Sequence, residues 1–337
     1  MAVPIWKDQY INLGAPAQSG EGVPYYIYCV AKGEVIYQGI AFPKPDATNA
    51  VIRINDICAD YLHSYFLVQD SPTMPARVTF RVYTTTGGSE TLAASVEFYN
   101  DWSYDPLYDP ESDGMNFPAV RTFGAFEMIP LTLWDGDPSP ATIYMENGQT
   151  RSYTPVKMLA GADFDSDYNH DYLRTMQYLA DSYVLPMSQF LGAARVVMNG
   201  ITYLASKYCP RYVLYYLNAY GGWDALPVEG KTRISDSVTH YTSEMVYDNA
   251  GVNRRGKENY VNELKHTYEF CTRWLTNEQS ALMHHLLNSP SVFVHDMETR
   301  LIRPLVLTNG ATEYKQQKGG WLSYTIEAEL AQSRIRR

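Results

Sequence analysis

The chain lacks the cysteine pattern of a disulfide-bonded domain and the basic charge of a nucleic-acid-binding protein. Its four cysteines are Cys29, Cys58, Cys209 and Cys271. They stand far apart with no paired spacing, which favours reduced, buried thiols made in a cytoplasm. The 37 acidic residues outnumber the 27 basic ones and give a formal net charge of -10. Because an acidic surface repels phosphate backbones, no nucleic-acid partner is expected.

Long apolar runs and familiar catalytic motifs are also missing. Residues 1–7 have neither a basic start nor an apolar run, so no secretory signal is expected. Nothing approaches the ~18 continuous apolar residues of a membrane span, so no membrane insertion is expected. The sequence has no phosphate-binding glycine loop, no His-Glu-x-x-His helix and no Gly-x-Ser-x-Gly elbow. These absences predict a non-enzymatic protein without a cofactor.

Tyrosine is the residue in excess, with 29 Tyr against 11 Phe and 6 Trp. A tyrosine has a rigid apolar body and a polar tip, which suits half-wet strands and surfaces that meet a partner. The alternative is that tyrosine simply fills strand positions. The fold class that we predict is mainly β, with two antiparallel sandwich-like modules and a C-terminal antiparallel module flanked by one α-helix.

Residues 1–100 are predicted to form the first β-sandwich. The candidate strands are residues 6–13, 24–30, 35–41, 50–54, 78–83 and 92–99, and a short helical turn should follow Asn55 and end near Tyr61. Alternating apolar residues predict a hairpin with one buried side, in which Val78, Phe80 and Val82 face Leu92, Ala94, Val96 and Phe98.

An acidic, proline-rich stretch at residues 101–125 is interpreted as a linker or long loop. The second β-rich domain is expected at residues 126–247. It contains two strong hairpin signals, Asn147-Gly148 between strands 141–145 and 150–154, and Asn199-Gly200 between strands 194–198 and 201–205.

One acidic run in this domain is a candidate cation site. Asp163, Asp165 and Asp167 stand at alternate positions and could supply oxygen ligands to a hard cation such as Ca²⁺. The EF-hand pattern fails, however, because Tyr168 replaces the turn glycine and Arg174 replaces the bidentate glutamate. The favoured interpretation is therefore an acidic loop that caps a following helix, with no bound metal.

Residues 248–337 are predicted to form the C-terminal module. Its helix, at residues 276–288, should begin with a capping box between Thr276 and Gln279. The final strand alternates, with Tyr324 and Ile326 on one face and Trp321 on the other. A long strand here suits a sheet continued across subunits, and the alternative is an ordinary α+β domain whose helix covers one sheet face.

Three runs in this module carry a resemblance: YEFCTRWLTNE (268–278), LLNSPSVFVHD (286–296) and YTIEAELAQ (324–332). Together they resemble the C-terminal part of structural proteins, distal-tail-like, from tailed phages and prophages of gut Bacteroidetes. The resemblance implies a virion protein, made in the host bacterial cytoplasm, whose β-rich module assembles into a ring of the tail or baseplate.

We therefore expect a structural protein that pairs with copies of itself and docks other phage tail proteins. The expected interface residues are Trp274, Trp321, Tyr324 and Ile326, since buried aromatic residues and strand edges supply affinity at such contacts. The alternative is a carbohydrate- or receptor-binding module that takes a host glycan, with Trp223 as a stacking platform. A glycosidase, which needs two carboxylates facing each other in a cleft, is a more distant alternative.

Overall fold

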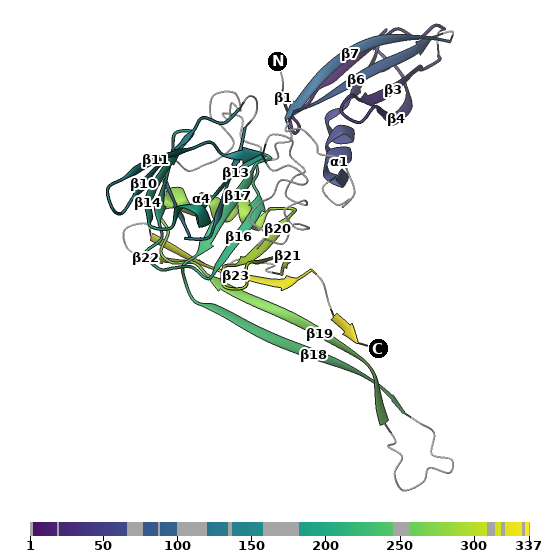
Figure 1. Ribbon diagram of the computed structural model, residues 1–337. Coiled ribbons are helices and arrows are strands. Elements are labelled where there is room, and N and C mark those ends of the chain that lie inside the picture. Colours follow the sequence, from purple (N-terminus) through teal and green to yellow (C-terminus); the bar gives the residue numbers. More distant parts are fainter. Residues whose placement is uncertain are drawn as a thin grey trace.

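The computed structural model describes residues 3–18, 20–65, 77–86, 88–99, 120–133, 137–157, 182–244, 257–308, 314–317, 321–331 and 334–336. Within these residues the fold is mainly β, with largely antiparallel sheets and two α-helices, as the sequence predicts (Figure 1).

The N-terminal module is a sheet covered on its inner face by a helix and a small second sheet. The main sheet has the order β1-β7-β6-β3-β4. Its strands are β1 (Val3–Pro4), β3 (Val23–Cys29), β4 (Glu34–Ala41), β6 (Arg77–Thr86) and β7 (Ser89–Tyr99). The other elements are β2 (Tyr10–Gly14), its partner β5 (Ala50–Arg53) and the helix α1 (Asn55–Tyr65), which is longer than the turn predicted there. Among the described residues, the buried side chains of this core lie between Ile5 and Phe98.

The β6–β7 hairpin has the predicted register over most of its length. Val78 pairs with Phe98 and Phe80 with Val96, and all four side chains lie in the core. A bulge after Val82 then shifts the register, so Leu92 of β7 lies outside with half of its side chain exposed. The strict alternation read from the sequence fails at that point because a bulge adds one residue to one strand.

The middle module contains two more sheets, in the orders β11-β10-β14-β15-β8 and β12-β13-β9. Their strands are β8 (Val120–Phe123), β9 (Met128–Thr132), β10 (Ala141–Met145), β11 (Thr150–Tyr153), β12 (Val156–Lys157), β13 (Ser182–Pro186), β14 (Ala193–Met198) and β15 (Ile201–Ala205), with a 3-10 helix at Met187–Phe190. Both Asn-Gly hairpins are confirmed. Asn199 and Gly200 have φ values of 46° and 76°, as a tight turn between twisted strands requires.

The C-terminal module is built on one large sheet with the order β17-β16-β20-β21-β23-β19-β18. Its strands are β16 (Tyr212–Leu217), β17 (Trp223–Val228), β18 (Thr232–Glu244), β19 (Lys257–Cys271), β20 (Val292–Asp296), β21 (Leu301–Leu307), β22 (Tyr314–Gln317), β23 (Trp321–Leu330) and β24 (Arg334–Arg336). The helix α4 (Asn277–Leu287) has the predicted capping box, in which Thr276 accepts from the Gln279 amide and Gln279 accepts from the Thr276 amide.

The middle and C-terminal modules stack as successive layers. In β16, Val213 and Tyr215 pack toward β9 and β13 of the middle module, while Leu214 and Tyr216 pack toward α4. The opposite face of β9 and β13, which includes Ile129, packs on the sheet β11-β10-β14-β15-β8 of the middle module. The continuous burial of all six residues of β16 follows from this position between two layers.

Two expected domain boundaries are corrected by the sheet topology. The boundary between residues 247 and 248 falls between β18 and β19, which pair along their length, so it divides one hairpin. The division lies instead between β15 and β16. The end of the expected linker, residues 101–125, forms β8, which pairs in parallel with β15. Long-range pairing of this kind leaves no local pattern in the sequence.

In the described part of the chain, neither helix has the length and apolar character needed to cross a lipid bilayer.

Candidate functional site

The outer part of the β18–β19 hairpin is the candidate assembly site. Residues 267–271 of β19 pair with β23, but farther out the described partners of β19 are β18 and, at residues 262–264, β24. This outer hairpin extends well past the rest of the sheet (Figure 1). We call residues 233–244 and 257–266 the arm. Since a two-stranded hairpin alone is marginally stable in water, an arm of this length needs further support.

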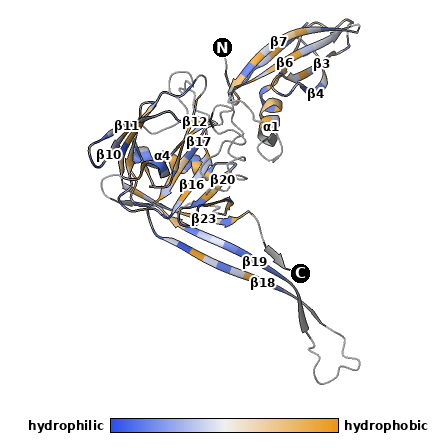
Figure 2. Ribbon diagram, in the orientation of Figure 1, coloured by the Kyte–Doolittle hydropathy of each residue, from blue (hydrophilic) through white to orange (hydrophobic). Residues whose placement is uncertain are grey.

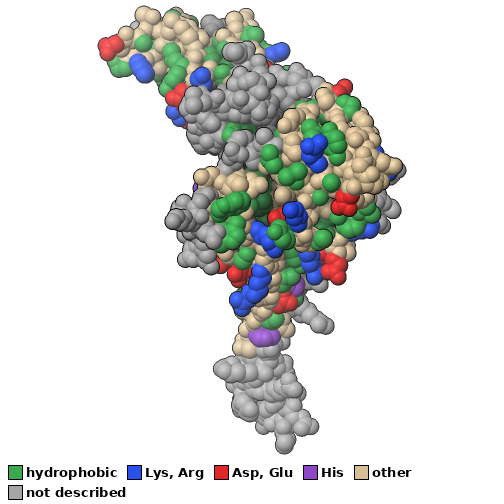
Figure 3. Space-filling view, turned by 90° about the vertical axis from the view of Figure 1, so that its left-hand side faces the viewer, with side chains coloured by type: hydrophobic (Ala, Val, Ile, Leu, Met, Phe, Trp, Pro, Cys, Tyr) green, Lys and Arg blue, Asp and Glu red, His purple; other side chains and the backbone are tan. Residues whose placement is uncertain are grey.

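One face of the arm continues the sheet face that packs beneath α4, and on it apolar residues alternate with polar pairs. Ile234 pairs with Tyr268, and Val238 pairs with Leu264, so these four side chains share one face. Tyr268 is buried in the core beneath α4, whereas Ile234 and Val238 are 49% and 48% exposed. Hydrophobic and hydrophilic positions are mixed along β18 (Figure 2), and hydrophobic side chains lie among charged ones from the body down to the arm (Figure 3).

Two polar pairs on this same face link the arm strands and alternate with the apolar residues. Asp236 Oδ1 lies 2.5 Å from His266 Nδ1, and Asn262 Oδ1 lies 2.6 Å from His240 Nδ1. The sheet order ends at β18, so among the described residues the outward backbone groups of this strand have no strand partner. An exposed strand edge is a template for pairing with another chain.

The four predicted interface residues fall into two groups. Trp274 and Trp321 are each 45% exposed, and each directly precedes one of the two residues, Leu275 and Leu322, that form a backbone bridge. Tyr324 and Ile326 are 4% and 0% exposed and belong to the core beneath α4. Their predicted contact with another subunit is therefore wrong. The alternation was read correctly, but the chain's own helix covers that face.

The predicted stacking platform is also wrong. Trp223 is 2% exposed and packs against Phe293, with ring centroids 5.9 Å apart. Its backbone N–H donates to Thr132 Oγ1 at 3.0 Å. A turn-rich sequence placed this residue near a surface, but the indole lies between the C-terminal sheet and β9, where no sugar can stack on it.

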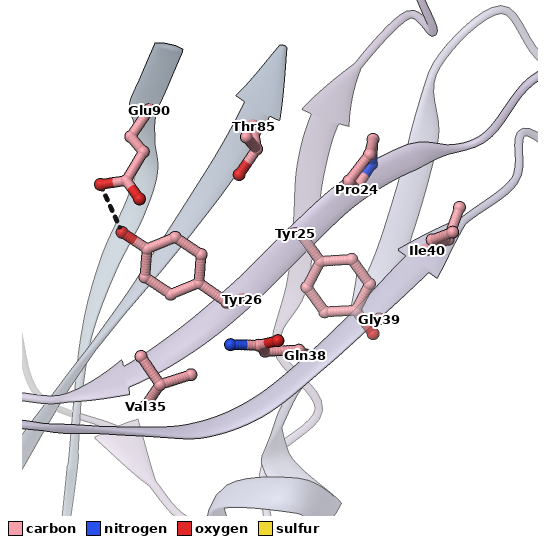
Figure 4. Close-up of a pocket in the computed structure, with 9 residues that line it drawn as sticks. All are labelled: Pro24, Tyr25, Tyr26, Val35, Gln38, Gly39, Ile40, Thr85 and Glu90. Carbon is pink, nitrogen blue, oxygen red and sulfur yellow. Dashed lines mark hydrogen bonds between the residues drawn. The ribbon is translucent and has the colours of Figure 1, made fainter. Parts of the chain in front are cut away.

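An aromatic surface that the sequence did not single out lies on the outer face of the N-terminal sheet. A hollow of about 620 Å³ opens there, and its lining includes Pro24 and Tyr26 of β3, Gln38 and Ile40 of β4, Thr85 of β6 and Glu90 of β7. We call it the tyrosine hollow. The Tyr26 ring lies between Glu90 and Gln38 (Figure 4). These lining residues come from four strands, so they lie together only when the sheet is folded.

Two contacts fix the Tyr26 side chain. Its ring stacks on that of Tyr83 with centroids 5.0 Å apart and planes 16° from parallel. Its hydroxyl donates to Glu90 Oε2 at 2.9 Å. Burial, followed by this hydrogen bond and the charge of Glu90, raises the pKa of Tyr26 to about 12, so the phenol remains a donor at neutral pH.

A buried polar cluster joins the middle and C-terminal modules. Arg121 of β8 and Asp224 of β17 are 4% and 1% exposed and form a two-pronged ion pair, with Arg121 Nη2 3.0 Å from Asp224 Oδ2. Asn218 Nδ2 donates to the same carboxylate oxygen at 3.1 Å. Nearby, Glu127 is 1% exposed and accepts from the Gly124 amide at 2.8 Å. Burial raises the pKa of Glu127 to about 8, which leaves this carboxyl mostly neutral at pH 7.

This cluster is buried and contains one cation and one anion that satisfy each other, so we assign it a structural role. Sequence reasoning missed it because Arg121 and Asp224 are 103 positions apart. The signal available was two charged residues within apolar strands, and a single sequence does not show that they pair.

The candidate cation ligands Asp163, Asp165 and Asp167 lie outside the described residues. In the part of the chain that the structure does describe, no group of three or more His, Cys, Asp or Glu side chains could hold a metal ion.

Comparisons with known proteins add no identification. No protein-family model matches the chain, and no curated protein matches it. A solved structure titled "Extended-Synaptotagmin 2, C2A- and C2B-domains" aligns over 97% of this chain and 89% of that chain, at 8% identity and with a TM-score of 0.14. A TM-score this low carries no argument about fold or function.

Proposed function

We propose that the chain is a non-enzymatic structural component of a phage tail or baseplate that assembles with copies of itself and docks neighbouring tail proteins. The observation that carries the proposal is the arm, which leaves the body of the sheet while one of its faces remains partly apolar. The sequence resemblance to phage tail proteins is the reason for placing this assembly in the tail of a virion.

The physical reason lies in the stability of the arm. Val238 and Ile234 each leave about half of their side chain in water, and β18 is the last strand of the sheet formed by the described residues. A second copy that covers this face would remove apolar surface from water at about 25 cal/mol per Å² and would complete backbone pairing at the edge. The surface tryptophans Trp274 and Trp321 add a second exposed aromatic site on the same module.

A ring requires that two different surfaces of one chain meet, because a head-to-tail contact repeats around an axis whereas a two-fold contact stops at a dimer. In this proposal the arm is one of those surfaces, and it lies on the body of the next copy. The N-terminal module then remains available for docking other tail proteins.

The test compares two single substitutions in the arm. Val238→Asp places a charge on the face of the arm that carries Ile234 and Leu264, and Ser237→Asp places the same charge one residue away, on the opposite face. Light scattering after size-exclusion chromatography should give a ring mass for the unaltered chain and for Ser237→Asp, and a reduced mass for Val238→Asp. Because both sites are exposed, both variants should keep the melting temperature of the unaltered chain. An equal mass for all three would overturn the role of the arm.

A further inference from the structure

We propose that the tyrosine hollow is a binding site for an uncharged saccharide. This function is separate from the proposed assembly, since the hollow lies on the outer face of the N-terminal sheet and the arm lies in the C-terminal module.

The apolar half of the site is the ring of Tyr26, which lines the hollow and stacks on the neighbouring Tyr83. An aromatic ring presents a flat apolar surface, and the C–H face of a pyranose ring is the apolar surface of a sugar. Tyr26 is held by its stack on Tyr83 and by its hydrogen bond to Glu90. Since the ring is already fixed, binding costs little side-chain entropy, which favours a ligand that makes few contacts. Ile40, 61% exposed, extends the apolar floor toward the edge strand β4.

The polar half of the site comes from three strands of the same sheet, β4, β6 and β7. Gln38 of β4 offers both a donor and an acceptor, Thr85 of β6 offers a hydroxyl, and Glu90 of β7 offers carboxylate oxygens. Vicinal hydroxyls of a sugar are donors and acceptors at once, so they match this mixture. A purely apolar ligand would leave these groups without partners, at a cost in affinity.

Charge and size narrow the ligand class further. Among the described residues, the side chains that line the hollow include one carboxylate and no lysine or arginine, so sialylated or sulfated sugars should be repelled. The volume of about 620 Å³ falls within the range of about 300–1,000 Å³ that small-molecule sites occupy, so the hollow has room for a small saccharide.

The experiment is a glycan array that carries neutral, sialylated and sulfated oligosaccharides, probed with the full chain. The strongest neutral binder is then titrated by calorimetry against variants. Tyr26→Ala should weaken binding about tenfold or more through loss of the ring, and Gln38→Ala should weaken it by a smaller factor. The matched control is Tyr10→Ala, because Tyr10 is 63% exposed in the same module but lies outside the hollow.

Three results would overturn the proposal: no neutral saccharide bound by the unaltered chain, a preference for anionic sugars, or equal affinity in Tyr26→Ala and Tyr10→Ala. Since Gln38 is exposed, the Gln38→Ala variant keeps the test informative if Tyr26→Ala does not fold. A change in oligomeric mass with Tyr26→Ala, without a change in sugar binding, would assign the hollow to a protein contact and also overturn the proposal. Sugar binding that persists in Val238→Asp would separate this site from assembly through the arm.

Discussion

The guanidinium of Arg121 on β8 and the carboxylate of Asp224 on β17 form a buried ion pair between two sheets that belong to different modules. Asn218 shares the carboxylate, and Trp223, next to Asp224, donates its backbone N–H to Thr132 of β9. The pair therefore lies in the layer where the middle and C-terminal modules join, and the two modules should unfold together.

The first prediction concerns this pair. Asp224→Asn would leave the Arg121 charge buried without a compensating anion, which should lower the free energy of unfolding by about 3–5 kcal/mol. The control is Arg211→Met, because Arg211 is 53% exposed and pairs with Asp296 and Glu298 at the surface, where a loss below about 1 kcal/mol is expected. Urea denaturation of both variants measures the difference. Equal losses in the free energy of unfolding would show that the buried pair stabilises the fold no more than the exposed pair does.

The second prediction concerns Glu127 and pH. Its pKa of about 8 in the folded chain lies above the usual 4.5, with burial as the main cause. Between these two values the folded chain holds a proton that the unfolded chain has released, so this group makes the free energy of unfolding fall as pH rises. The slope from one such group is at most about 1.4 kcal/mol per pH unit. Glu127→Gln should flatten the stability profile between pH 5 and pH 8, and an unchanged profile would contradict the assignment.

The third prediction concerns the start of α4. Thr276→Ala removes the side-chain oxygen that accepts from the Gln279 amide and should cost about 1 kcal/mol of stability. Thr276→Ser keeps that oxygen and should lose only a few tenths of this amount. Thermal melts of the two variants provide the measurement. If serine and alanine were equally damaging, the loss would come from the methyl group rather than from the cap.

The fourth prediction concerns the base of the arm. A Cβ atom added at Gly230 would lie 2.1 Å from the carbonyl oxygen of Cys271, which is backbone and cannot rotate away. Gly230→Ala should therefore push β18 away from β19 and increase hydrogen exchange at the arm amides. Lys231→Ala, at the next and exposed position, is the control and should leave the exchange rates unchanged. Equal exchange in both variants would show that the backbone accommodates the added methyl group.

Local features of the fold were predictable from the sequence, because each depends on a few neighbouring residues. The capping box at Thr276 and the turn at Asn199 and Gly200 are of this kind. The alternation in the last strand also predicted correctly that Tyr324 and Ile326 face a buried side. It could not show whether a second subunit or the chain's own α4 covers that side, since both give the same pattern.

Features built from distant residues were not predictable in this way. The tyrosine hollow depends on Tyr26 and Tyr83 lying on adjacent strands, and the module boundary depends on β18 pairing with β19. Trp223 lies beside a glycine turn in the sequence, yet long-range packing on Phe293 buries it. Each of these outcomes follows from sheet order, which a single sequence does not encode as a local pattern.

Negative-stain electron microscopy of the purified, unaltered chain at high concentration tests the assembly proposal most directly. The account predicts closed rings in which the arm of each copy, residues 233–244 and 257–266, lies against the next copy. Single elongated particles at every concentration would contradict it, because the half-exposed side chains of Ile234 and Val238 would then remain uncovered in the isolated protein.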